Sequence, residues 1–269
     1  MRLAVLFLTG WFLLLVSPQI SFALQEQEEG QASAEQEAVQ EEAAGDEGVV
    51  VLFDGSSLDH FRGYHNEEIG AGWSIEEGML KFDGSGGGDI ITREQFGNFE
   101  LTFEWMVTEG ANSGVMYRVS TGDGAPYFSG AEYQILDDDQ HRDGGNVLTS
   151  AGSLYAMYAP ENKTLQPVGE WNEAKIVLNG ATVEHWLNGV KVVEAELGSE
   201  DWNTRLAASK FKDWEKFARN ESGHIAFQDH GDTVFYRNIV VRPIVEENDS
   251  GEAAGGENSA AASGVRSDG

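Results

Sequence analysis

The chain has 269 residues, a formal net charge of −29 and no cysteine. The lack of thiols excludes disulfides, thiol nucleophiles and thiolate metal sites. The strongly negative charge argues against nucleic acid and anionic membranes as partners.

The first residues have the features of an export signal. Arg2 precedes an apolar run over residues 3–16, and Ser21-Phe22-Ala23 places small residues at the two positions that a signal peptidase reads. The run is short for a membrane span, although a retained anchor stays the alternative. We therefore predict a signal peptide over residues 1–23 and a periplasmic or secreted protein that is not held in the membrane after cleavage.

Two further segments lack the composition of a folded domain. Residues 24–48 contain nine acidic side chains and no Lys, Arg or aromatic residue. So little apolar surface cannot offset the entropy of ordering, which predicts a disordered acidic linker, with a solvated helix as the alternative. Residues 246–269, rich in Glu, Gly, Ala and Ser, predict a disordered tail. One domain over residues 49–245 remains, long enough for a sizeable core.

Short segments with period-two alternation, separated by turn residues, predict β-strands throughout this domain. The predicted strands are residues 49–53, 73–76, 79–82, 99–107, 114–119, 131–136, 173–179, 182–187, 191–196, 223–228 and 233–242. Two-residue hairpins are predicted at Glu77-Gly78, Asn179-Gly180 and Asn188-Gly189, because these residues tolerate positive φ. Such strands imply an all-β sandwich of two antiparallel sheets.

Residues 202–219 depart from the strand pattern. Residues that recur there at helical spacing are Ala207, Phe211, Trp214 and Ala218. This spacing predicts a short helix or a helical loop lying across the sandwich.

The stretch 112–141 contains the densest collection of groups able to do chemistry. Alternation puts Glu132 and Gln134 on one face of the strand over residues 131–136, with Tyr133 on the opposite, core face. If this strand and the strand before it share a sheet, Arg118 points into the same groove as Glu132 and Gln134.

The same stretch resembles a known bacterial family, together with other blocks that occur in the same order. The blocks are Leu52-Phe53-Asp54-Gly55, Asn112-Ser113-Gly114, Glu132-Tyr133-Gln134-Ile135-Leu136-Asp137, Gly152-Ser153-Leu154-Tyr155, Ser209-Lys210-Phe211 and Gln228-Asp229-His230-Gly231. They resemble the domain of unknown function 1080, also described as the 3-keto-disaccharide hydrolase domain. The resemblance covers residues 49–244 and implies a concanavalin A-like jelly roll whose concave face holds sugar.

Catalytic candidates come from the polar faces of the predicted strands. Glu132 is the leading candidate, because a Glu-x-Gln alternation beside Arg118 resembles the paired-carboxylate strands of jelly-roll glycosidases; a solvated strand carboxylate is the alternative. His230 is the next, since histidine titrates near neutrality, although it can equally hold the following turn. Glu104 lies on the polar face of its own strand. The catalytic interpretation requires Glu104, Arg118, Glu132, Gln134 and His230 to converge.

Substrate-binding candidates are more widely spread. Lys210 can bring a cation to an acidic groove, unless it is a surface lysine on an amphipathic helix. Tyr155 and Trp186 can stack on the C–H face of a sugar, or simply pack. Asn112 and Gln228 belong to the blocks that carry the family resemblance.

A divalent cation is a further expectation. Asp137 and His141 lie four residues apart on an Asp-rich loop, and carboxylates and imidazoles are suitable ligands. Loose Asp-rich loops are more often only hydrated, so the metal remains one of two alternatives.

The family resemblance implies an enzyme that acts on an oxidised glucoside or disaccharide. A ketone at C3 makes the C2 proton acidic, so that a base can remove it and expel the C1 substituent, after which water adds to the double bond. Arg118, Lys210 or a bound cation would stabilise the enolate. Direct hydrolysis by Glu104 and Glu132, a non-catalytic carbohydrate-binding module and a structural or adhesive domain are the alternatives.

Overall fold

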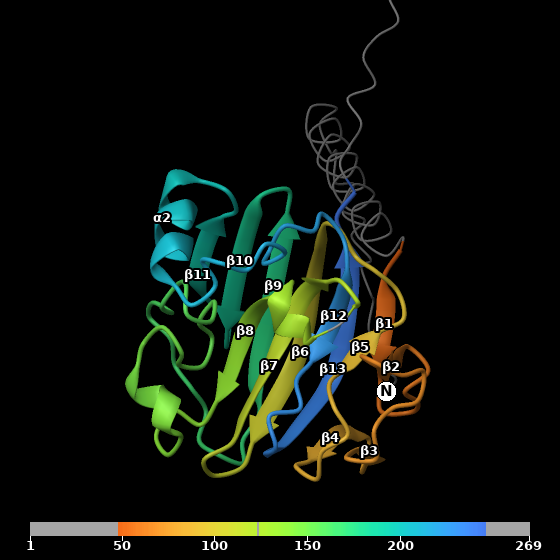
Figure 1. The fold of residues 1–269 in the computed structure, drawn as a ribbon. Coiled ribbons are helices and arrows are strands. Elements are labelled where there is room, and N and C mark those ends of the chain that lie inside the picture. The colour runs from red at the N-terminus through yellow and green to blue at the C-terminus, as the bar shows by residue number, and fades with distance from the viewer. Residues whose placement is uncertain (1–47, 123, 246–269) are drawn as a thin grey trace, which may run out of the picture.

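The computed structural model describes residues 48–122 and 124–245 (Figure 1). The predicted signal peptide, nearly all of the predicted linker and the predicted tail lie outside the described residues. Within the described ranges, no helix has both the length and the apolar character needed to cross a bilayer.

Two antiparallel sheets pack face to face and enclose the core (Figure 1). In spatial order, the eight-stranded sheet contains β11 (Val190–Glu196), β10 (Thr182–Leu187), β9 (Asn172–Asn179), β6 (Phe99–Val107), β13 (Thr233–Pro243), β4 (Met79–Asp83) and β3 (Trp73–Glu76), with β1 (Val50–Phe53) also paired to β13. The five-stranded sheet contains β2 (Phe61–Gly63), β5 (Ile90–Thr92), β12 (His224–Phe227), β7 (Asn112–Val119) and β8 (Ala131–Leu136). The predicted all-β sandwich is confirmed.

Every predicted strand is present with its ends within two residues, whereas β2 and β5 were missed. These two strands have only three residues each, too few to show alternation. Two of the hairpins have positive φ at both predicted loop residues, Glu77-Gly78 and Asn188-Gly189. The third is displaced by one residue, because Asn179 still pairs with Thr182 and the loop is Gly180-Ala181.

The core forms where the inward faces of the two sheets meet. Burial alternates strictly along β6, and its Trp105 is fully buried. Its inward neighbour Phe103 packs edge-on against Tyr133 of the opposite sheet, with ring centroids 5.8 Å apart. His185 of β10 is fully buried in this core, and its Nε2 lies 3.0 Å from the Tyr117 hydroxyl. The outward faces of both sheets are therefore the places where polar side chains gather.

The predicted helical segment is only partly helical. Helix α2 (Glu200–Ala208) begins at Ser199, whose hydroxyl accepts the N–H of Trp202, and lies beside β11 (Figure 1). Beyond Ala208 the chain forms turns, in which Phe211 and Phe217 stack with their ring centroids 4.0 Å apart. Through this aromatic packing the segment lies across the outer face of the five-stranded sheet, and Lys210 is placed there.

Candidate functional site

A cavity of about 160 Å³ lies on the outer face of the five-stranded sheet. Its lining residues are Asn112, Tyr127, Glu132, Gln134, Tyr155, Lys210, Phe211, Gln228 and His230. Strands β7 and β8 form the floor, and the segments that follow β8, β12 and α2 supply the walls. Seven of the predicted site residues, far apart in sequence, therefore meet around one space.

Glu132 lies on the floor of the cavity and is only 7% exposed. Its neighbours Ala131 and Tyr133 face the core, so strand alternation turns the carboxyl outward. Burial raises its pKa from 4.5 to about 8; the charge of Lys210 opposes this shift, and that of Asp89 adds to it. Glu132 is therefore largely protonated at neutral pH.

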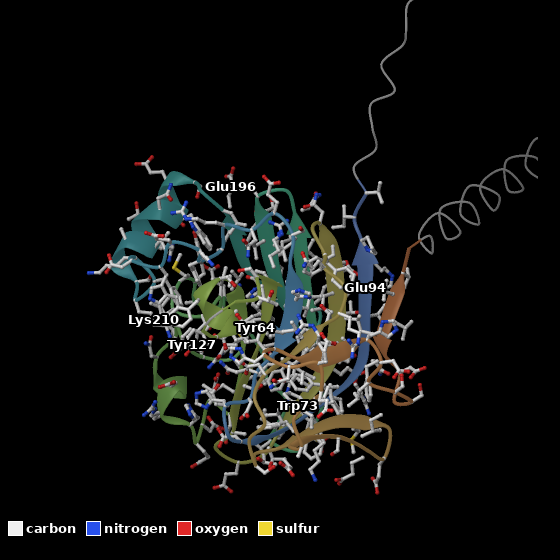
Figure 2. All side chains as sticks on the ribbon, turned by 45° about the vertical axis from the view of Figure 1, so that its right-hand side comes forward. Tyr64, Trp73, Glu94, Tyr127, Glu196 and Lys210 are labelled. Atoms are coloured by element: carbon white, nitrogen blue, oxygen red, sulfur yellow. The ribbon has the colours of Figure 1, made fainter. Side chains whose placement is uncertain are left out.

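Lys210 reaches the same cavity from the segment after α2. Its ammonium lies 4.2 Å from the ring centroid of Tyr155 and 5.2 Å from that of Phe211. Burial lowers the pKa of Lys210, while the carboxyls of Glu132 and Asp143 act in the opposite direction. Figure 2 shows Lys210 and Tyr127 on the same side of the molecule, as their shared cavity requires. A cation thus faces a carboxyl group that burial keeps protonated.

A chain of polar side chains runs from the cavity floor to its rim. The Gln134 amide donates to Asn112 Oδ1 at 3.3 Å, which leaves the Asn112 amide nitrogen 3.4 Å from His230 Nε2. On the other side of the ring, His230 Nδ1 lies 3.6 Å from the carboxylate of Asp232, which also accepts the backbone N–H of Asn112. This arrangement favours the tautomer with the proton on Nδ1 and a lone pair on Nε2.

Two amide oxygens at the cavity have no hydrogen-bond partner in the part of the chain that the structure describes. Gln134 Oε1 and Gln228 Oε1 are buried and accept no hydrogen bond from the described residues. Buried polar atoms are nearly always paired, because leaving one unpaired costs about 1–3 kcal/mol. Both glutamines line the cavity, where the hydroxyl groups of a ligand are the donors that could pair with these oxygens.

A possible cation site lies at the rim. His141, His230 and Asp232 place one ligand atom each within 4.8 Å of one another. However, His141 Nδ1 already accepts the N–H of Asp143 at 3.1 Å, so the proton of a neutral ring lies on Nε2. A metal bound at Nδ1 of His141 would have to displace the Asp143 N–H, and a metal bound at Nε2 would have to displace the ring proton. The donor set therefore fits a cation only after a rearrangement of His141.

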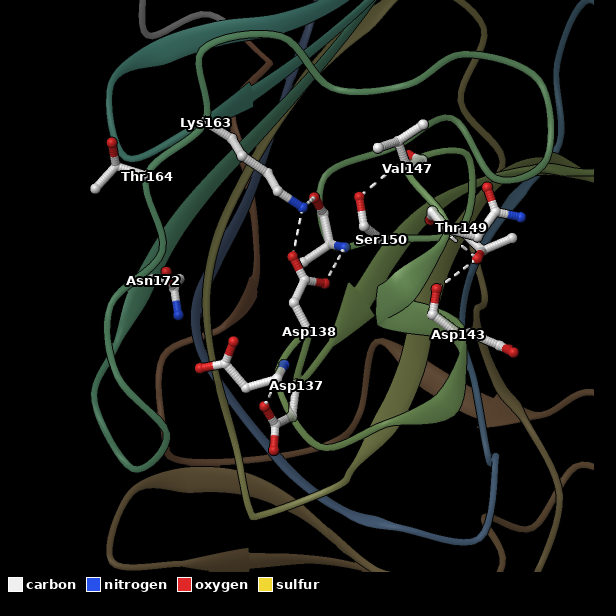
Figure 3. A network of polar contacts seen from close by, with 12 residues as sticks. Asp137, Asp138, Asp143, Val147, Thr149, Ser150, Lys163, Thr164 and Asn172 are labelled. Atoms are coloured by element: carbon white, nitrogen blue, oxygen red, sulfur yellow. Dashed lines mark hydrogen bonds and ion pairs between the residues drawn. The ribbon is translucent and has the colours of Figure 1, made fainter.

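The predicted ligand Asp137 is not part of this group. Its carboxylate accepts backbone N–H bonds from Gly110, Asp139 and Gln140, so it holds the loop together. The adjacent Asp138 binds Lys163 and the N–H of Ala151 (Figure 3). Asp137 therefore lies apart from the three side chains that could hold a cation, and its oxygens accept hydrogen bonds from the backbone.

Arg118 was expected beside Glu132 but lies elsewhere. A register shift opposite β12 inserts an extra residue near the end of β7, and Arg118 there has φ 51°. Its guanidinium is buried against the carbonyl of Gly97, the side-chain oxygen of Asn98 and the carbonyl of Gly180. It lines a separate cavity, and its bond to Gly180, next to β9, joins the two sheets.

Glu104 and Trp186 were also expected at the site and are not there. Both face outward, as alternation predicted for Glu104, but from β6 and β10 of the eight-stranded sheet. Glu104 is paired with Arg237, and Trp186 lies beneath Lys175, 4.3 Å from the ring centroid. Alternation identified the correct face of each strand but could not say to which sheet the strand belongs.

Several residues at or near the site were not predicted from the sequence. Tyr127 and Phe211 line the cavity, and Asp232 orients His230. Asp89 is mostly buried with its pKa raised to about 6, and it accepts the N–H of Asp229 at 2.8 Å. Of these residues, only Asp232 could have been found from the sequence, because it lies two positions after His230. The other residues are brought to the site by loops.

Comparisons with known proteins agree with this architecture. The family model of the 3-keto-α-glucoside-1,2-lyase-like domain matches residues 48–242. A Bacteroides thetaiotaomicron protein named 3-keto-disaccharide hydrolase is 37% identical over an alignment of 229 residues, and the match covers 74% of this chain and 79% of that protein.

Solved structures from Parabacteroides distasonis are also similar. One, provisionally described as a glycosyl hydrolase, has a TM-score of 0.70 and 32% identity, and the match covers 77% of this chain and 97% of that chain. A second with the same description has a TM-score of 0.55 and 27% identity, over 73% of this chain and 99% of that chain. The chain therefore belongs to the family of 3-keto-α-glucoside-1,2-lyase-like domains.

Proposed function

We propose that this protein is a carbohydrate hydrolase that cleaves glycosides oxidised at C3 by elimination followed by hydration. The observation that carries the proposal is the convergence of Glu132, His230 and Lys210 on one cavity. Membership of the family and the name of the Bacteroides relative support the substrate class.

His230 acts as the base in this proposal. Its Nε2 lone pair faces the cavity side, and Asp232 lies beside Nδ1, where a carboxylate stabilises the charged ring. In the first step Nε2 takes the C2 proton, and the electron pair of the C2–H bond moves to form the enolate of the C3 ketone. Substrate would displace the long contact between His230 and Asn112.

Lys210 stabilises the enolate. Its side chain is exposed, and its ammonium lies over the aromatic wall of the cavity, where its positive charge can stabilise a developing oxyanion. Arg118, the other cation considered from the sequence, is committed to the carbonyls of Gly97 and Gly180.

Glu132 acts as the acid. A carboxyl group with a pKa of about 8 carries its proton at neutral pH and can give it to the oxygen that leaves C1. As the C3 carbonyl re-forms, the C1–O bond breaks and a C1=C2 double bond appears. Water then adds its oxygen to C1 and a proton returns to C2, which completes a net hydrolysis.

The test compares a 3-keto-glucoside with its parent glucoside. We expect release of the aglycone from the ketone alone, and losses of at least about 100-fold in kcat for Glu132→Gln and for His230→Asn. Equal rates on both substrates would instead indicate direct hydrolysis, and binding without release from either would indicate a carbohydrate-binding module.

A bound divalent cation is the second candidate for the enolate-stabilising group. His141, His230 and Asp232 would hold it, and His230 could then no longer act as the base. Dialysis against a chelator separates the two mechanisms. Activity that survives dialysis supports Lys210 in this role, whereas activity lost and restored by Mn²⁺ or Zn²⁺ supports the cation.

Export is the remaining part of the proposal. The apolar run near the N-terminus and Ser21-Phe22-Ala23 support it. N-terminal sequencing of protein from the periplasm or medium should give Leu24 as the first residue, whereas a chain that begins at Met1 would contradict cleavage.

A further inference from the structure

Two exposed aromatic side chains lie next to the cavity. Tyr127 is 39% exposed and Phe128 is 43% exposed, and both belong to η1 (Pro126–Phe128). The other large apolar side chains exposed in the described ranges are aliphatic. Exposed aromatic surface beside a polar cavity is typical of a binding site for a ring with an apolar face.

The two rings form one surface with Trp214, and we refer to Tyr127, Phe128 and Trp214 as the aromatic shelf. Trp214 lies 4.7 Å from the ring centroid of Phe128 and 5.9 Å from that of Tyr127. Behind it, Phe211 packs edge-on at 4.9 Å and also lines the cavity. The shelf is therefore continuous with the cavity wall.

The backbone holds the shelf in place. The N–H of Ala218 donates to the carbonyl of Ser129 at 2.8 Å, which joins the segment carrying Trp214 to the segment carrying Tyr127 and Phe128. The Ser129 hydroxyl bonds to the carbonyl of Pro126 at 3.3 Å. Such a surface loses little conformational entropy when a ligand binds.

The size of the cavity indicates what lies on the shelf. Pockets that enclose a drug-sized ligand have volumes of roughly 300–1,000 Å³, whereas this cavity holds about 160 Å³. A molecule of two rings does not fit inside it. If the ring that reacts occupies the cavity, the group attached at C1 must lie outside it, and Tyr127, which belongs to both the cavity and the shelf, connects the two surfaces.

We propose that the aromatic shelf binds the aglycone ring of the substrate and thereby selects glycosides whose leaving group carries a ring. This proposal rests on the proposed function, because it needs a glycoside cleaved in the cavity. A sugar ring offers its C–H face to Phe128 and Trp214, and an aryl ring offers its π face.

The experiment measures kcat/KM for three 3-keto-glucosides, whose C1 substituents are a second glucose, 4-nitrophenol and methanol. For Phe128→Ala and Trp214→Ala we expect the ratio of either ring-bearing substrate to the methyl glycoside to fall about tenfold, the equivalent of about 1.4 kcal/mol of stacking. Phe128→Tyr, which keeps an aromatic ring at this position, should have the wild-type ratio. Phe235→Ala, a half-buried aromatic on the outer face of the eight-stranded sheet, is the matched control.

The outcomes separate the two proposals. If wild type cleaves all three substrates and the shelf variants keep the wild-type ratios, the shelf has no role in specificity and this inference is wrong. If wild type cleaves none of them, the proposed function fails and the inference fails with it. Thermal unfolding of each variant identifies those that do not fold, and Phe128→Ala, which removes the more exposed ring, keeps the test available if Trp214→Ala is unstable.

Discussion

Gly114 of β7 lies directly beneath the carboxyl group of Glu132 of β8. A Cβ atom at position 114 would come within 2.8 Å of Glu132 Cδ, closer than real Cβ contacts allow. The site therefore depends on a missing side chain as much as on those present, because only glycine leaves space for the buried carboxyl.

Gly114→Ala should displace Glu132 and lower kcat about 100-fold, since a misplaced acid no longer reaches the leaving oxygen. We expect a folded protein that is destabilised by about 1–3 kcal/mol, measured by urea unfolding. Gly145→Ala is the control, because a Cβ there meets nothing within 4 Å. A Gly114→Ala enzyme with wild-type kcat would contradict this account of the site.

Glu132→Gln should change the pH dependence of stability. Because the folded pKa of about 8 lies above the ordinary 4.5, the carboxyl contributes stability that is fully present below about 4.5 and is lost as the pH rises through about 8. The variant should therefore match wild type near pH 4.5 and become more stable than wild type at pH 9, by up to roughly 4 kcal/mol.

The measurement for this second prediction is urea unfolding of both proteins at several pH values. Glu215→Gln, which removes an exposed carboxyl from the segment after α2, serves as the control. A difference between Glu132→Gln and wild type that does not grow with pH would show that Glu132 is not buried in its neutral form.

Lys210→Met should lower kcat about 100-fold because the enolate loses its cation. The same change should move the alkaline limb of the kcat profile to higher pH, since the charge of Lys210 lowers the pKa of Glu132. The pH profile of kcat tests both effects, with the exposed Lys212→Met as the control. If the alkaline limb does not move, the charge of Lys210 does not lower the pKa of Glu132.

Asp232→Asn should lower kcat by about 10- to 100-fold with little change in KM. The carboxylate faces Nδ1 of His230, and its loss removes both the preference for the required tautomer and the stabilisation of the protonated ring. Steady-state kinetics give the two constants separately, and the exposed Asp213→Asn is the control. A rise in KM alone would assign Asp232 to binding.

Glu104→Gln should leave kcat/KM on a 3-keto-glucoside within about twofold of wild type. Glu104 lies on the outer face of the other sheet, where it pairs with Arg237, and partly exposed pairs contribute about 1 kcal/mol or less. If Glu104→Gln loses activity but unfolds at the same temperature as wild type, the result would instead support direct hydrolysis by two carboxylates.

Much of the fold follows from local patterns. Alternating residues along β6 and β8 predicted the strands and their faces, because successive side chains of a strand point in opposite directions. Turn residues such as Asn188-Gly189 predicted hairpins through their tolerance of positive φ. The short strands β2 and β5 carry no such pattern, and they exist only because their neighbours offer hydrogen bonds.

The site is less local in origin. The sequence by itself determined that Glu132 and Gln134 face away from the core, since that follows from strand periodicity alone. Only the tertiary structure decided that Lys210 and His230 meet them and that Glu104 does not, because the sheet to which a strand belongs is set by long-range pairing. It also decided the position of Arg118, where one extra residue near the end of β7 breaks the alternation and redirects the side chain.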